Sequence, residues 1–155
     1  MNEIKIQICD LYDMVFRHIF YKGQAGHGAP FLSFGTVFNN YFLPENLIDK
    51  MDTTIEEQNT FSIKKGDVFV TRTSETIDEL AMSSVALKDY PNATYSGFVK
   101  RLRPKTTGIV YDKFLAFYLR SKLFRKTMTN NATMTLRASF NEDIFFIFIF
   151  VSSSI

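Results

Sequence analysis

The chain has 155 residues, of which 46% are hydrophobic and 15% aromatic, so it can bury the core of a single domain, and extensive disorder is excluded. One cysteine, Cys9, excludes an internal disulfide, and the longest apolar run, residues 144–151, is too short to span a membrane, so a cytoplasmic protein without membrane contact is predicted. The net charge is only +2, but residues 1–60 hold four bases and eight acids whereas residues 95–140 hold ten bases and one acid, which favours a polyanionic partner for the second half.

The N-terminal third favours short elements joined by loops. Isoleucines alternate with polar residues over residues 4–8, which predicts a strand, and a short helix or turn is predicted over residues 10–17. Three glycines follow at Gly23, Gly26 and Gly28. Their spacing does not fit a dinucleotide-binding fingerprint and a proline follows them, so a flexible loop is favoured over a phosphate cradle.

The next segments are polar and punctuated by turns. Residues 31–35 are strand-like, and residues 39–44 predict a turn with a short extended piece. A short helix is predicted over residues 44–51, ahead of a loop or strand.

The clearest local signal lies in the middle of the chain. Residues 64–67 form a predicted turn, and the β-branched and aromatic residues 68–70 predict a buried strand. A second strand is predicted over residues 83–90, followed by a turn. A third, over residues 94–104, ends at Pro104.

One amphipathic helix is predicted after these strands, over residues 110–128, and its apolar face comprises Phe114, Leu115, Tyr118, Leu119 and Leu123. For its basic residues a solvated helix face is favoured over contact with a nucleic acid: Lys113, Arg120, Lys122, Arg125 and Lys126. Strands punctuated by turns together with one good helix predict the α+β class.

A cluster of polar side chains directly follows the clearest strand. Thr71, Arg72, Thr73, Ser74 and Glu75 supply hydroxyls, a guanidinium and a carboxylate at the end of a rigid element. Arginine can bind guanine through two hydrogen bonds, hydroxyls can serve bases or phosphates, and a glutamate can accept from cytosine or orient the arginine. The alternative is a polar surface turn in which Arg72 and Glu75 pair with each other.

Further basic residues are candidates for phosphate contact. Lys100, Arg101 and Arg103 lie on one predicted strand, where Arg101 and Arg103 share a side and Lys100 faces the other way. The alternative for them is a solvated strand face. Arg137 is predicted to be either a phosphate clamp or a structural anchor of its loop.

The order of these blocks resembles the target-recognition domain of type I restriction–modification specificity subunits. The resemblance starts from "IKKGDVFVTRTSETIDELAMSSVALKDYPNATYSGFVKRLRPK", continues through the helix "YDKFLAFYLRSKLFRK" and the loop "TMTLRASFNED", and covers nearly all of residues 4–143. It implies an α+β recognition domain that reads one half of a split target in double-stranded DNA. The DNA-binding candidates are Arg72, Thr73, Ser74, Glu75, Lys100, Arg101, Arg103 and Arg137.

The resemblance also implies what the chain leaves to others. Such a domain has no catalytic activity and needs no cofactor or metal, because methylation and cleavage belong to partner modification and restriction subunits. Residues 1–143 are predicted to form the recognition domain. Residues 144–155, "IFFIFIFVSSSI", are predicted to be an atypical apolar tail that replaces the expected spacer helix through truncation or a frameshift, which puts dimerisation and methyltransferase docking in doubt.

Two other functions compete with this interpretation. A small metal-dependent nuclease would require paired carboxylates and a nearby lysine, and the acids after Asp67 do not form such a block. A non-functional remnant or a protein-interaction module derived from a broken specificity subunit is the second alternative, and the apolar tail favours it.

Overall fold

A four-stranded antiparallel sheet forms the centre of the computed structural model, which describes residues 2–16, 23–74, 76–130, 133–134, 138–139 and 146–151. Its strands lie in the order β2–β9–β5–β7, and their bounds are Tyr12–Phe16 for β2, Val99–Pro104 for β9, Val68–Thr71 for β5 and Ser83–Val85 for β7. Every residue of β5 is buried, because the sheet is covered on both faces. The continuous apolar run of β5 follows from that double burial.

Helices cover one face of this sheet. Val68, Val70 and Leu102 pack there with residues of α1 (Ile8–Leu11), α4 (Asp112–Tyr118) and α5 (Lys122–Asn130). The core on this face therefore combines residues 8–12, the central strands and residues 110–128.

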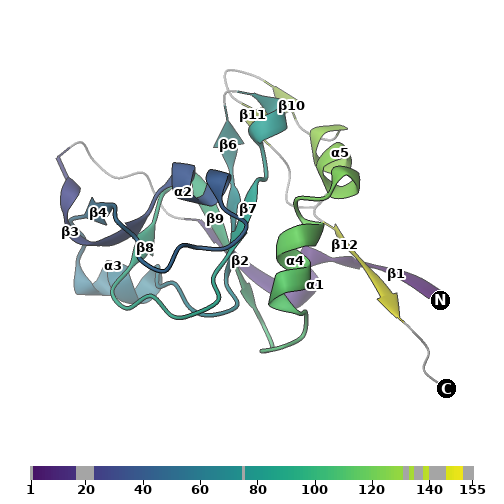
Figure 1. Cartoon of the computed structure of the whole chain (residues 1–155), viewed down its shortest axis with the longest axis horizontal. Coiled ribbons are helices and arrows are strands. Elements are labelled where there is room, and N and C mark those ends of the chain that lie inside the picture. Colours follow the sequence, from purple (N-terminus) through teal and green to yellow (C-terminus); the bar gives the residue numbers. More distant parts are fainter. Residues whose placement is uncertain are drawn as a thin grey trace.

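A second sheet covers the other face. It has the order β4–β3–β8, with bounds Lys50–Met51 for β4, Ala25–Leu32 for β3 and Thr94–Tyr95 for β8. The Tyr95 ring meets the Phe69 ring edge-on at 5.3 Å, and Val99 lies in the same cluster. Helices α2 (Phe34–Asn39) and α3 (Ile55–Thr60) lie on this side of the molecule (Figure 1).

Two small sheets extend from this body (Figure 1). The first has the order β10–β11–β6, with bounds Thr133–Met134, Ala138–Ser139 and Thr73–Ser74, and the 3₁₀ turn η1 (Ile77–Glu79) follows β6. The second pairs β1 (Asn2–Gln7) with β12 (Phe146–Val151) in antiparallel register. Part of the apolar tail is thus a strand, while the predicted domain boundary at residue 143 stays a prediction.

The strand predictions over residues 4–8, 68–70, 83–90 and 94–104 are confirmed in part or in full by β1, β5, β7, β8 and β9. The short helix or turn predicted over residues 10–17 is wrong after Leu11, because strand β2 begins at Tyr12. The helix predicted over residues 44–51 is also wrong. The Tyr90 hydroxyl donates to the carbonyls of Leu43 and Pro44, and the Leu43 amide donates to the Val85 carbonyl, which holds this segment extended.

The single helix predicted over residues 110–128 is two helices. The amides of Arg120 and Ser121 donate to carbonyls three residues back, which tightens the end of α4. The Ser121 hydroxyl then accepts from the Phe124 amide and begins α5 as an N-cap. Because of this break Leu115 and Leu119 are fully buried, whereas Leu123 is 65% exposed.

The glycine segment belongs to strand β3 from Ala25 onward, so the flexible loop predicted there is wrong. The strand is irregular, since both Ala25 and Ala29 pair with Met51. Gly26 and Gly28 both have a φ of +92°, which other residues rarely adopt. A Cβ atom at Gly28 would lie 2.6 Å from the Met51 carbonyl oxygen, whereas one at Gly26 would meet nothing within 4 Å.

Gly28→Ala should therefore destabilise the protein more than Gly26→Ala. Both variants carry the cost of a left-handed backbone, roughly 1–2 kcal/mol, and only Gly28→Ala adds a clash with β4, worth roughly 1–3 kcal/mol. Urea unfolding of the two variants measures the difference. Equal losses would show that β3 and β4 do not approach as closely as described.

Arg120 joins three parts of the fold, contrary to the solvated helix face predicted for it. Its guanidinium donates to the carbonyls of Ser83, Val37, Phe38 and Asn40 at 2.7–3.0 Å. It also lies 4.8 Å from the centre of the Tyr41 ring. Arg120 therefore ties the end of α4 to strand β7 and to the end of α2.

Replacing Arg120 with alanine should lower the free energy of unfolding by about 3 kcal/mol, because it leaves several carbonyls without their donor. Lys113→Ala is the control, since Lys113 is an exposed base on the same helix and should change stability by less than about 0.5 kcal/mol. Denaturant titration monitored by circular dichroism distinguishes the two. Similar values for both variants would contradict the anchoring role.

Candidate nucleic-acid interface

The polar cluster that follows β5 divides into a buried and an outer part. Thr71 is fully buried. Its hydroxyl donates to the Glu79 carbonyl at 2.9 Å and accepts from the Met82 amide at 2.8 Å. Thr71 therefore joins the end of β5 to the residues that precede β7, and its buried side chain cannot face a ligand.

Arg72 is the first residue of the cluster to reach the surface. It is partly exposed, and its amide donates to the Phe98 carbonyl at 2.9 Å, which fixes its backbone against the segment before β9. Thr73 and Ser74 form β6, directly after Arg72. Glu75 lies outside the described residues.

Strand β6 brings two candidate blocks together that are far apart in the sequence. Thr73 pairs with Ser139 and Ser74 pairs with Ala138, so β11 lies against β6. Arg137 itself is outside the described residues, but it immediately precedes Ala138 in the chain. The backbone therefore places Thr73–Ser74 and Ala138–Ser139 in one small sheet, which Figure 1 shows at the top of the view as β6, β10 and β11.

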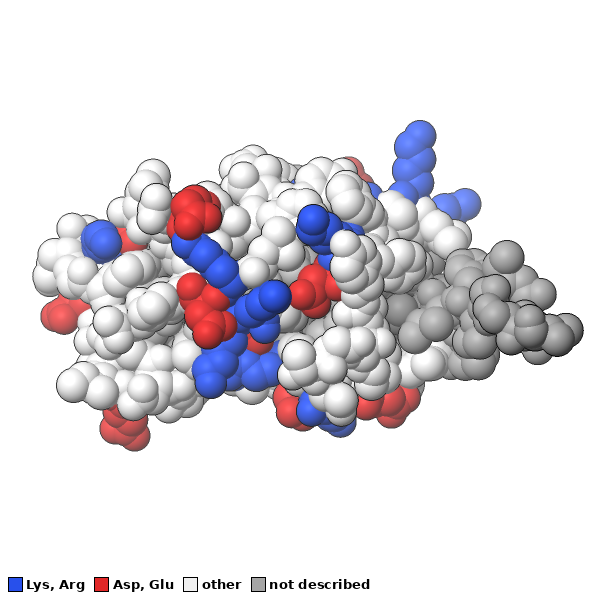
Figure 2. Space-filling view, turned by 60° about the horizontal axis from the view of Figure 1, so that its bottom comes forward, with Lys and Arg blue, Asp and Glu red and all other residues white. Residues whose placement is uncertain are grey.

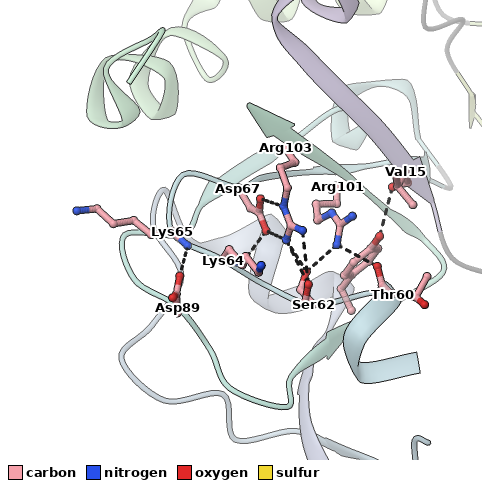
Figure 3. A network of polar contacts seen from close by, with 10 residues as sticks. Val15, Thr60, Ser62, Lys64, Lys65, Asp67, Asp89, Arg101 and Arg103 are labelled. Carbon is pink, nitrogen blue, oxygen red and sulfur yellow. Dashed lines mark hydrogen bonds and ion pairs between the residues drawn. The ribbon is translucent and has the colours of Figure 1, made fainter. Parts of the chain in front are cut away.

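Arg101 and Arg103 extend from one side of β9 and meet at the same residue, as their spacing predicts (Figure 3). Arg103 binds the Asp67 carboxylate through two hydrogen bonds of 2.8 and 2.7 Å and also donates to the Ser62 carbonyl. Arg101 donates to the carbonyls of Ser62 and Thr60. Two strands and the end of α3 are joined by these contacts.

The surroundings of the two guanidinium groups differ. Arg101 is 6% exposed, and burial lowers its pKa. Its hydrogen bonds to the Asp67 carboxylate raise the pKa of Arg103. Lys100 is 6% exposed as well. This geometry favours a structural role for Arg101 and Arg103, and the phosphate contact assigned to all three residues stays a prediction.

The charge excess of residues 95–140 is smaller at the surface than in the sequence. Arg101, Arg103, Arg120 and Arg125 all donate to carbonyls of their own chain. The exposed bases of this stretch, within the described residues, are Lys105, Lys113, Lys122 and Lys126. On the face drawn in Figure 2, basic residues are interspersed with acidic ones, so that face carries no broad basic patch.

Within the described residues, no group of three or more histidine, cysteine, aspartate or glutamate side chains lies in a position to hold a metal ion. Among the same residues, no helix combines the length and the apolar character that crossing a membrane requires.

Sequence reasoning missed two residues that shape the candidate interface. The solvated helix face predicted for Arg125 is wrong, because its guanidinium donates to the carbonyls of Asp78 and Leu80. Thr71 was grouped with the reading residues, although it closes the base of the segment. An alternation of polar and apolar residues cannot reveal this role, because all four residues of β5 are buried.

Comparisons with known proteins identify the fold. No family model and no curated protein matches the chain. Among solved structures, a type I restriction–modification S subunit from M. genitalium is 15% identical, with a TM-score of 0.57 over 95% of this chain and 33% of that one. An HsdS subunit from Thermoanaerobacter tengcongensis is 13% identical, with a TM-score of 0.60 over 94% of this chain and 32% of that one.

A third match comes from a structure of the type I restriction–modification system that describes complex assembly and conformational transition. It is 15% identical, with a TM-score of 0.59 over 95% of this chain and 33% of that one. The chain spans about a third of the length of the solved chains it matches. It therefore shares the α+β fold of the matched third of these solved chains, two of which are S (HsdS) subunits of type I restriction–modification systems.

Proposed function

We propose that this chain binds double-stranded DNA in a sequence-specific manner, as a target-recognition domain of a type I restriction–modification specificity subunit that reads one half of a split target. The observation that carries the proposal is the pairing of β6 with β11, which joins the "TRTS" segment to the strand that follows Arg137. The major groove of B-DNA is wide enough to admit a β-ribbon. A small sheet whose strand β6 consists of Thr73 and Ser74, directly after Arg72, suits that groove.

The residues divide by role in this proposal. Arg72 reads a base edge, and Thr73 and Ser74 contact bases or phosphates from β6. Glu75 and Arg137 complete this set from the sequence. Exposed lysines such as Lys122 and Lys126 position the domain on the phosphate backbone. Methylation and cleavage belong to partner modification and restriction subunits, so the chain itself is not an enzyme.

The affinity for DNA should fall as salt rises. If several lysines neutralise phosphates, log affinity falls linearly with log salt, with a slope of about −0.9 for each phosphate contacted. Fluorescence anisotropy with a labelled duplex of random sequence, between about 50 and 200 mM salt, measures the slope. An affinity that does not change with salt would contradict DNA binding by this surface.

Arg72→Ala should reduce specificity, whereas Arg101→Ala should reduce stability. Loss of a bidentate contact to a base costs about 1–3 kcal/mol on the preferred site and relaxes the preference at one base pair. Arg101→Ala removes the donor to Ser62 and Thr60, so it should lower the free energy of unfolding while the folded protein keeps its sequence preference.

The test uses duplexes that the unsubstituted protein selects from a randomised library, compared with scrambled versions at one salt concentration. If Arg72→Ala weakens binding to selected and scrambled duplexes equally, the assignment of Arg72 is wrong. A uniform loss of affinity in folded Arg101→Ala would instead restore Arg101 as a phosphate contact.

A further inference from the structure

The connection between β5 and β7, residues 72–82, carries the proposed reading strand and is closed at its base. Strand β5 pairs with β7, so the two ends of the connection meet. The Thr71 amide donates to the Met82 carbonyl at 2.9 Å, and the Ala81 amide donates to the Thr71 carbonyl at 3.0 Å. With the two hydrogen bonds of the Thr71 hydroxyl, four contacts lock this base.

The hydrogen bonds at the base do not reach β6 and η1, which form the outer part of the connection. Other contacts must therefore hold these two elements. Strand β6 is only two residues long, and its pairing with β11 involves two residue pairs. Pairing this short does not fix a strand by itself. The η1 turn that follows β6 has only three residues, so it is too short to be held in place by helical hydrogen bonds of its own.

From α5, Arg125 binds one carbonyl of η1 and the carbonyl of the residue that follows η1. Its Nη1 atom donates to the Leu80 carbonyl and its Nη2 atom donates to the Asp78 carbonyl. A guanidinium presents its donors in a rigid planar fork, so it fixes the spacing of the two carbonyls as well as their position. Burial lowers the pKa of Arg125, Arg120 lowers it further, and Asp78 raises it. The cost of removing this cation from water is offset by the two carbonyls.

We propose that Arg125 is a positioning residue for DNA recognition: from α5 it holds η1 in place, and thereby fixes β6 in the register that presents Arg72, Thr73 and Ser74 to the groove. This inference rests on the proposed function. It assigns a specificity-determining role to a residue that is predicted to make no contact with DNA.

Arg120 provides a matched control. It is also a partly buried arginine of the α4–α5 segment that donates to backbone carbonyls, but its partners lie in α2, in the segment that follows α2 and in β7. Arg120→Gln should therefore lower global stability without selectively loosening the β5–β7 connection. Arg125→Gln should do the opposite, and Arg125→Lys should recover part of the loss because it keeps a donor and the charge.

Two measurements on the full chain test the proposal. The first is amide hydrogen exchange of the DNA-free variants, where Arg125→Gln should accelerate exchange at the amides of β6 and η1 by about tenfold or more, while Ala81, Met82, β5 and β9 stay protected. The second is the ratio of affinities for library-selected and scrambled duplexes. Arg125→Gln should lower this ratio about tenfold through weaker binding to the selected duplex, with little change on the scrambled one.

The outcomes separate the inference from the proposed function. If the unsubstituted protein selects no sequence from the library, the proposed function fails and the recognition role of Arg125 fails with it, whatever the exchange data show. If the protein selects a sequence but Arg125→Gln changes neither exchange nor the affinity ratio, only the inference is overturned. An equal fall of the affinity ratio in Arg120→Gln would also overturn it, because the effect would then reflect general stability.

Discussion

Strand β5 is buried on both faces, and a buried polar side chain lies at each of its ends. Asp67, just before the strand, is 0% exposed, and its carboxylate is satisfied by Arg103 and by the Lys64 amide. Thr71, its last residue, is equally buried and is satisfied by the Glu79 carbonyl and the Met82 amide. An unsatisfied buried polar group is costly, so these contacts determine where the turn before β5 and the connection after it must lie.

The arginines of this protein explain why its sequence overstates its basic surface. A run of bases with few acids predicts an electrostatic surface for a polyanion. Arg101, Arg103, Arg120 and Arg125 instead bind carbonyl oxygens or Asp67, because short elements leave many carbonyls without partners in regular structure. Lysines carry most of the exposed charge that remains among the described residues of this stretch. Charge counts in proteins rich in short strands and loops therefore say less about the surface than the same counts on a long helix.

Local sequence signals predicted the elements that depend on local chemistry. The strand of β5 and the end of β9 at Pro104 follow from β-propensity and from the missing amide of proline. Helix α3 was also within reach. Thr54 and Glu57 form a capping box, with hydrogen bonds of 2.8 and 3.2 Å between them, and the "TTIEE" pattern encodes it. Ser121 marks the break between α4 and α5. The amphipathic pattern continues past this residue, so the pattern alone does not reveal that Ser121 is an N-cap.

The pairing of β6 with β11 was not predictable in the same way, because two-residue strands carry almost no pattern and their partners are distant in the chain. The sequence identified the residue types of the candidate site but not the contacts that hold them. Those contacts share a physical property. Arg120 and Arg125 bind backbone carbonyls, which every residue possesses, so the side chain at an exposed position such as Asp78 can change while the acceptor stays in place. Anchoring through the backbone thus lets the exposed side chains of the β5–β7 connection vary while the segment keeps its position on the rigid sheet.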